Sequence, residues 1–272
     1  MVDTGFVYAA TGEMYVALAV RSARSLREAI PDARIHLFAD IDCTDEVFDA
    51  VHRLSRSHFR PKFEALRSSP FERSVYLDAD TYVSADISDI FDLLQQFDIA
   101  GAHVFRRNSR ACRRYYRDPL PNSFPQINTG VLGLRRNKRT HAFLEAVEGE
   151  MDASDAQFDQ AVFRELLFHS DLRLAVLPPE YNFKEPGKAA ILSSDDTAPR
   201  VIHESRLHGT YDPDVGLLES LEALNGPDLL RHVEALIAAD RYLHPAATGK
   251  VRPLAISSKP GLFDRFRKHP RG

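Results

Sequence analysis

Hydrophobic and polar positions alternate along the chain in short segments that predict strands and helices in turn. Continuous apolar runs predict buried strands at residues 6–10, 34–39, 73–77, 99–104, 129–134, 172–177 and 200–202. Helical spacing of apolar residues predicts helices at 15–29, 45–54, 62–67, 138–147, 156–168 and 216–243. Strands and helices that alternate in this way are typical of an α/β protein. The connection that runs from about residue 105 to 125 is long enough to suggest a functional loop.

The length of 272 residues suits one or two domains, and the composition shows no shift that would mark a second one. We therefore expect a single domain over residues 1–256, followed by a basic tail at 257–272. Hydrophobic residues make up 44% and charged residues 27% of the chain, which excludes disordered and low-complexity classes. The tail is typical either of a frayed terminus or of a short amphipathic turn on an anionic membrane.

The cysteines and the first residues bear on the cellular compartment. Cys43 and Cys112 are the two cysteines of the chain, so a disulfide framework and a cysteine-rich zinc site are excluded. The start lacks a basic region, and the apolar run at 15–20 is too short for a signal peptide or a membrane span. We expect a cytoplasmic protein, with any membrane contact at the periphery.

Three common phosphate-binding or nucleophile motifs are absent from the sequence. It contains no G-x-G-x-x-G, no G-x-x-x-x-G-K-[ST] and no G-x-S-x-G. A phosphate group would therefore be held by another device. A divalent cation that bridges carboxylates and a diphosphate is the obvious alternative, because magnesium and manganese prefer oxygen ligands.

Paired aspartates with the spacing Asp-x-Asp occur at 40–42, 78–80 and 212–214. Such a pair is ordinarily a strand-end turn or a helix cap, so its context must decide. Asp78 and Asp80 come directly after a run of apolar residues, which places them at the carboxyl end of a buried strand. Ligands of open α/β sheets bind at that end. The pair at 40–42 also follows a predicted strand, so position alone does not choose between them.

Five motifs follow one another along the chain: Phe-Val-Tyr-Ala-Ala-Thr-Gly-Glu-Met-Tyr at 6–15, Val-Tyr-Leu-Asp-Ala-Asp-Thr-Tyr-Val at 75–83, Asn-Thr-Gly-Val at 128–131, Asp-Gln at 159–160 and Val-Ile-His at 201–203. In this order, over roughly residues 5–209, they resemble glycosyltransferase family 8, the group that contains glycogenin and bacterial lipopolysaccharide galactosyltransferases. The resemblance implies a GT-A type nucleotide-diphospho-sugar transferase fold, which is a Rossmann-like mixed sheet flanked by helices. It also implies an enzyme that uses a UDP-sugar as its donor.

The resemblance places particular residues at the donor. The nucleotide, its diphosphate and its sugar would be contacted by Ala10, Thr11, Tyr15, Lys62, Asp78, Ala79, Asp80, Gly130 and Arg206. Arg206 stands near the position of a family lysine, because this chain reads His-Glu-Ser-Arg-Leu-His-Gly at 203–209 where the family has a histidine closely followed by glycine and lysine.

The metal implied by the resemblance is Mn²⁺ or Mg²⁺, held by Asp78, Asp80 and a histidine. His203 is the preferred third ligand because it directly follows a predicted strand. His208, which precedes a glycine, is a competitor, and the sequence leaves the choice open.

The resemblance also implies a reaction. Asn128, Asp159 and Gln160 would orient the donor sugar, and a hexose would pass to an acceptor hydroxyl with retention of configuration through same-face attack. Asp159 is not assigned as a nucleophile. A non-catalytic protein that binds sugar nucleotides or glycans on the same scaffold is the alternative.

Charge is distributed unevenly along the chain. The net charge is −4, yet residues 105–139 hold ten basic residues and Asp118 as their one acidic residue, so this segment carries +9 and the rest −13. We expect an anionic glycan, a lipid-linked saccharide or a membrane surface as its partner. Tyr115, Tyr116 and Phe124 are candidates to stack on an acceptor sugar. The alternative is a solvated, arginine-rich loop whose charges pair with acidic residues elsewhere in the protein. The net negative charge of the chain disfavours nucleic acid as a partner.

Overall fold

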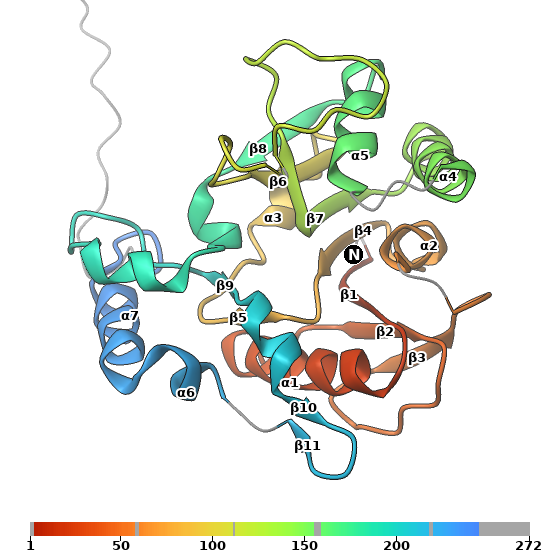
Figure 1. Cartoon of the computed structure of the whole chain (residues 1–272). Coiled ribbons are helices and arrows are strands. Elements are labelled where there is room, and N and C mark those ends of the chain that lie inside the picture. Colours follow the sequence, from red (N-terminus) through yellow and green to blue (C-terminus); the bar gives the residue numbers. More distant parts are fainter. Residues whose placement is uncertain (1–2, 58–59, 111, 155–158, 218–219, 245–272) are drawn as a thin grey trace, which may run out of the picture.

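A seven-stranded mixed sheet is the centre of the fold (Figure 1). The computed structural model describes residues 3–57, 60–110, 112–154, 159–217 and 220–244. The strands are arranged in the order β3-β2-β1-β4-β7-β6-β8, and β7 runs antiparallel to both of its neighbours. Their bounds are Thr4–Ala10 for β1, Ile35–Ala39 for β2, Ala50–Arg53 for β3, Arg73–Leu77 for β4, Ile99–His103 for β6, Ile127–Arg135 for β7 and Leu174–Leu177 for β8.

Helices cover both faces of this sheet, which is why its central strands are almost continuously apolar. Alternate residues of β1 enter different hydrophobic clusters: Phe6 and Tyr8 pack on the side of α1, whereas Val7 packs on the opposite side. The first face is covered by α1 (Glu13–Ala29). The other face is covered by α2 (Lys62–Ser68), α4 (Lys138–Ala153) and α5 (Asp159–Phe168). The predicted α/β class and GT-A type of fold are confirmed.

A small two-stranded ladder attaches the later part of the chain to the sheet. Strand β5 (Thr81–Val83) pairs antiparallel with β9 (Val201–His203), and the register sets Thr81 opposite His203. The remaining elements are α3 (Ile90–Leu93), η1 (Pro179–Asn182), η2 (Pro186–Ile191), η3 (Ser205–Thr210), β10 (Tyr211–Asp212), β11 (Gly216–Leu217), α6 (Leu221–Asn225) and α7 (Pro227–Ala239). The ladder thus carries a histidine of β9 to the carboxyl end of β4.

One of the predicted helices, at 45–54, is wrong, and another, at 216–243, is wrong in part. The segment 45–54 contains the edge strand β3, because its backbone pairs with β2 in a register that local spacing does not reveal. The segment 216–243 is divided into β11, α6 and α7. Gly226 adopts a positive φ of 82° between the two helices and Pro227 begins the second, which explains the break. The other predicted elements differ from the structure by a few residues at their ends, and residues 155–158 of the predicted helix at 156–168 lie outside the described ranges.

None of the helices in the described ranges is long and apolar enough to cross a membrane. The predicted basic tail at 257–272 lies outside those ranges.

Asp98 joins several elements at one end of the sheet. Its side chain is fully buried at the start of β6, where it accepts hydrogen bonds from the Asn137 amide at 3.0 Å and the Arg173 backbone N–H at 3.0 Å. Arg135 and Arg139 donate to the same carboxylate at 3.1 and 2.9 Å. Burial alone would raise the pKa of Asp98, but these donors and charges outweigh it and hold the pKa below its ordinary value.

We expect Asp98→Asn to lower the free energy of unfolding by about 3 kcal/mol at neutral pH, because Arg135 and Arg139 lose the buried carboxylate with which they pair. The folded-state pKa is depressed, so this stabilisation is present above about pH 4 and is lost as the pH falls through the lower folded-state value. Urea unfolding at several pH values measures both effects. Asp152→Asn is the matched control, since its ion pair with Arg56 is half exposed and contributes less than about 1 kcal/mol. Equal losses in the two variants would contradict this account.

Candidate active site

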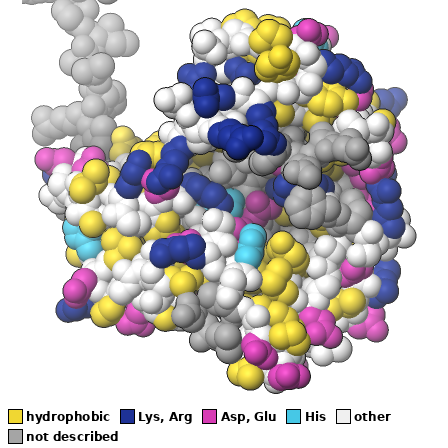
Figure 2. Space-filling model, in the orientation of Figure 1, with side chains coloured by type: hydrophobic (Ala, Val, Ile, Leu, Met, Phe, Trp, Pro, Cys, Tyr) yellow, Lys and Arg dark blue, Asp and Glu magenta, His cyan; other side chains and the backbone are white. Residues whose placement is uncertain are grey.

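A cavity of about 530 Å³ opens at the carboxyl ends of β1 and β4. Figure 2 shows it as a hollow in which acidic and histidine side chains lie below a rim of lysines and arginines. It is lined by twelve of the residues that the sequence predicted: Ala10, Thr11, Tyr15, Lys62, Asp78, Ala79, Asp80, Asn128, Asp159, Gln160, His203 and His208. Segments far apart in the sequence therefore meet in one place.

The turn that follows β4 is held in place by backbone and hydroxyl groups. The N–H of Asp78 donates to the Gly130 carbonyl of the neighbouring strand β7 at 2.8 Å. The Asp78 carbonyl accepts from the Thr81 hydroxyl at 2.7 Å. That hydroxyl is hydrogen-bonded to Ser22 of α1 at 2.8 Å, and Ser22 to Tyr8 at 3.0 Å. A buried chain of hydroxyl groups thus fixes the turn from which Asp78 and Asp80 project.

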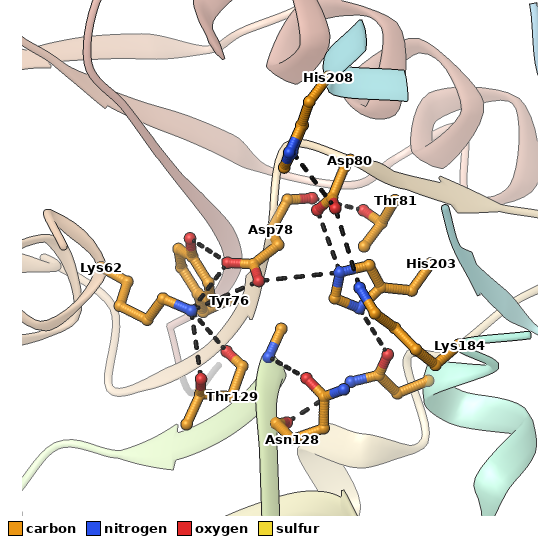
Figure 3. A network of polar contacts seen from close by, with 12 residues as sticks. Lys62, Tyr76, Asp78, Asp80, Thr81, Asn128, Thr129, Lys184, His203 and His208 are labelled. Atoms are coloured by element: carbon orange, nitrogen blue, oxygen red, sulfur yellow. Dashed lines mark hydrogen bonds and ion pairs between the residues drawn. The ribbon is translucent and has the colours of Figure 1, made fainter. Parts of the chain in front are cut away.

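Asp78, Asp80 and His203 form a group whose ligand atoms all lie within 4.8 Å of one another. The Nε2 atom of His203 lies 3.1 Å from Asp80 Oδ1 and 4.0 Å from Asp78 Oδ2 (Figure 3). The Asn182 side-chain oxygen accepts from Nδ1 of the same ring at 2.9 Å, which leaves Nε2 as the nitrogen that faces the carboxylates. Two carboxylates and one imidazole are a donor set that suits Mn²⁺ or Mg²⁺.

The charge state of Asp80 follows from its neighbours. Burial alone would raise its pKa, but His203, Lys184 and His208 outweigh burial and hold the pKa well below the ordinary value. Asp80 is therefore an ionised carboxylate at neutral pH.

His208 lies at the edge of the group rather than within it. Its Nε2 atom is 3.3 Å from Asp80 Oδ2, and its ring packs edge-on against Tyr15. The His208 side chain is 38% exposed, whereas that of His203 is 4% exposed. The geometry places His203 with both aspartates and His208 with Asp80 alone.

Lys62 connects the two acidic centres of the cavity. Its buried ammonium lies 3.0 Å from Asp78 Oδ1 and 3.4 Å from Asp159 Oδ2, and the Thr129 hydroxyl donates to that same Asp159 oxygen at 2.7 Å. Burial alone would lower the pKa of Lys62, but the two aspartates outweigh it and raise the pKa. Burial would raise the pKa of Asp159, and Lys62 and Arg60 reverse this effect. Lys62 and Asp159 therefore stay charged at neutral pH, so Asp159 is not a proton donor there.

Several residues of the site were missed by the sequence reasoning. Tyr76 donates its hydroxyl to Asp78 Oδ1 at 2.8 Å, and the alternation of side chains along a strand could have indicated this pair. Lys184 and Arg60 also line the cavity and come from segments without a motif. Lys184 Nζ lies 4.0 Å from Asp80 Oδ2.

Two predicted residues lie outside the cavity lining. Gly130 sits behind the aspartates and donates its N–H to Asn128 Oδ1 at 3.0 Å. Arg206 is not brought to the cavity, because its guanidinium is held by Glu204, with Nε at 3.0 Å from Oε1, and donates to Asn225. Lys184 is the basic residue that the fold places near Asp80 instead.

The aromatic residues predicted for the acceptor do not line the cavity either. Tyr116 donates to Glu150 at 2.7 Å and Phe124 packs edge-on against Phe168, so both are held on the neighbouring helices. Tyr115 is exposed on the surface.

Comparisons with known proteins agree with this geometry. The family profile described as nucleotide-diphospho-sugar transferase matches residues 66–212, which include the paired aspartates. A search of curated proteins finds no match.

Solved structures share the fold at low sequence identity. The galactosyltransferase LgtC, solved with donor and acceptor sugar analogues, has a TM-score of 0.56 and 13% identity over 86% of this chain and 95% of its own. The glycosyltransferase GlyE of Streptococcus pneumoniae has a TM-score of 0.51 and 16% identity over 88% of this chain and 62% of its own. The bifunctional glycosyltransferase WbbM has a TM-score of 0.53 and 10% identity over 88% of this chain and 52% of its own.

The family match covers more than half of the chain and favours a transferase over a non-catalytic binding protein. The predicted resemblance to family 8 enzymes is confirmed at this level. The chain belongs to the nucleotide-diphospho-sugar transferase family.

Proposed function

We propose that this enzyme transfers a hexose from a UDP-sugar to an acceptor hydroxyl with retention of configuration, assisted by Mn²⁺ or Mg²⁺. The observation that carries the proposal is the convergence of Asp78, Asp80 and His203 in a cavity that also holds Asp159. The donor set fits a divalent cation, and Asn182 orients the imidazole toward it. When bound, the cation neutralises charge on the departing diphosphate.

Side chains of the cavity assist the proposed reaction by charge and by orientation of the sugar. In the proposed reaction the bond between the anomeric carbon and the diphosphate oxygen breaks, and the acceptor oxygen bonds to the same face. The acceptor proton passes to the departing diphosphate. Lys62, fixed between two carboxylates, adds positive charge near the place where negative charge develops. Asn128, Asp159 and Gln160 line the cavity and orient the sugar.

Other parts of the proposal rest on the sequence alone. A single domain over residues 1–256, a cytoplasmic location and peripheral membrane contact by the tail at 257–272 stay predictions. The acceptor is proposed to be an anionic glycan or a lipid-linked saccharide.

A panel of UDP-sugars tests the donor, with manganese, magnesium or EDTA present and with UDP release and heat stability as readouts. We expect one donor to release UDP only with a metal. Asp80→Asn should weaken metal-dependent donor binding by about a hundredfold or more, because the ion loses a charged ligand. Asp214→Asn is the matched control, since it removes an exposed carboxylate from another Asp-x-Asp pair and should change nothing. Equal donor binding with metal and with EDTA would refute the proposal.

Gly130→Ala tests how tightly the site is packed. A Cβ atom at this position would contact His203, at 2.7 Å from Nδ1, and would lie 2.9 Å from Asp78 Oδ2. We expect manganese affinity, measured by calorimetry, to fall about tenfold or more because two ligands must shift. Gly149→Ala on α4 is the control, since beyond its chain neighbours and the backbone of its own helix no atom lies within 4 Å of the added methyl group. Unchanged affinity in Gly130→Ala would mean that Asp78 and His203 do not both hold the ion.

Asp159→Asn separates sugar orientation from donor binding. We expect kcat to fall about a hundredfold or more, because the charge near the reacting sugar is lost. Metal-dependent UDP affinity should stay within about threefold, since Asp159 belongs to the sugar end of the cavity in this proposal. Transfer assays and calorimetry with UDP measure the two quantities, and Asp214→Asn again serves as control. A fall in UDP affinity that matches the fall in kcat would assign Asp159 to the nucleotide instead.

A further inference from the structure

The loop between β6 and β7, which we call the arginine loop (residues 104–126), forms one wall of the cavity. Val104, Phe105, Arg106, Ser109 and Cys112 line the cavity directly. Figure 2 shows lysine and arginine side chains gathered above the hollow, on the side where Figure 1 places this loop.

Some charges of this wall are neutralised within the protein. Arg106 forms an ion pair with Glu185 across the mouth of the cavity, and Arg117 pairs with Glu150 of α4 at 2.5 Å. These two pairs tie the loop to the rest of the fold. Glu165, which is buried, accepts from the backbone N–H of Arg117 at 2.9 Å and anchors the same stretch.

Four other arginines of this region, Arg107, Arg110, Arg113 and Arg164, have no ion pair with an acidic residue in the described part of the chain. Arg107 donates to the Asn122 carbonyl, and Arg164 of α5 donates to backbone carbonyls of the loop at 2.8 to 3.3 Å. Arg110 and Arg113 are exposed on the same loop and do not line the cavity themselves, and the Arg113 N–H donates to the Ser109 carbonyl at 3.1 Å. Among the described residues, no carboxylate lies within ion-pair distance of these four guanidinium groups.

Burial and the positive charge of Arg107 lower the pKa of two neighbouring groups, His103 and Arg164. Burial and then the charge of Arg107 hold the pKa of His103 below its ordinary value. Burial and the same arginine also lower the pKa of Arg164. The charge of Arg107 is therefore not neutralised by a neighbouring carboxylate and acts on the groups around it.

The donor does not need these arginines. The charged residues that line the cavity cancel, since four are basic and four are acidic: Arg60, Lys62, Arg106 and Lys184 against Asp78, Asp80, Asp159 and Glu185. A divalent cation then balances the diphosphate of a UDP-sugar. The positive charge of Arg107, Arg110 and Arg113 on the arginine loop is therefore available to bind another anion.

We infer that the acceptor is a saccharide that carries a phosphate or carboxylate group close to the hydroxyl that is glycosylated, and that Arg107, Arg110 and Arg113 bind this group. The inference rests on the proposed function, because it takes the cavity to be the donor site. Arginine suits both anions, since its planar guanidinium donates two parallel hydrogen bonds to either. Each of the three arginines directly follows a residue that lines the cavity, namely Arg106, Ser109 and Cys112, and this position favours an acceptor in the cavity over a membrane.

The test compares the full chain with Arg107→Gln/Arg110→Gln/Arg113→Gln on an array of neutral, phosphorylated and uronic acid oligosaccharides. Arg24→Gln/Arg53→Gln/Arg231→Gln is the matched control, since it removes three exposed arginines from α1, β3 and α7 and gives the same net charge. We expect the unmodified chain to select phosphorylated or uronic acid saccharides. The loop variant should lose about tenfold to a hundredfold in affinity and the control should lose none.

Binding of UDP with manganese is measured on all three proteins and should not differ between them. If the unmodified chain does not bind UDP with manganese, the donor proposal is refuted, whatever the oligosaccharide array shows. Selection of neutral saccharides, no selection of anionic ones, or equal losses in the two triple variants would overturn the inference. Binding to phosphatidylglycerol vesicles without binding to anionic saccharides would also overturn it, in favour of a membrane surface.

Discussion

The buried ammonium of Lys62 is the interaction on which the arrangement of the site depends. It lies between Asp78, at the end of β4, and Asp159, at the start of α5, with its side chain 5% exposed. A charge in such a place is tolerated only when opposite charges surround it, and removing one partner of a buried pair costs about 3 to 5 kcal/mol. The three groups therefore hold one another in position, and the cavity owes its shape to their mutual neutralisation.

The sequence predicted those features that local patterns control. Buried parallel strands read as continuous apolar runs, so β1, β2 and β4 were found almost to the residue. The aspartates at 78 and 80 were chosen among three similar pairs because ordered motifs surround them, and the cavity contains them.

The features that the sequence did not predict depend on contacts between distant segments. Strand β3 forms because its backbone pairs with the edge of β2, and the residues of β3 do not by themselves indicate a strand. The choice between His203 and His208 needed the β5–β9 register, which only the folded chain supplies. Lys184 lies on a segment without regular patterning. Arg206 forms its ion pair with Glu204, two positions away, instead of facing the cavity.

The β5–β9 ladder is only three residues long on each strand, yet it joins the paired aspartates to a histidine from the last third of the chain. The ladder is buried, since Val201, Ile202 and His203 are 0%, 2% and 3% exposed. Beyond it, the Glu204 N–H donates to the Asp80 carbonyl at 2.9 Å. If a divalent cation binds as proposed, Asp78, Asp80 and His203 would hold it across this ladder. Its binding free energy would then add to the stability of the contact between the two segments of the chain.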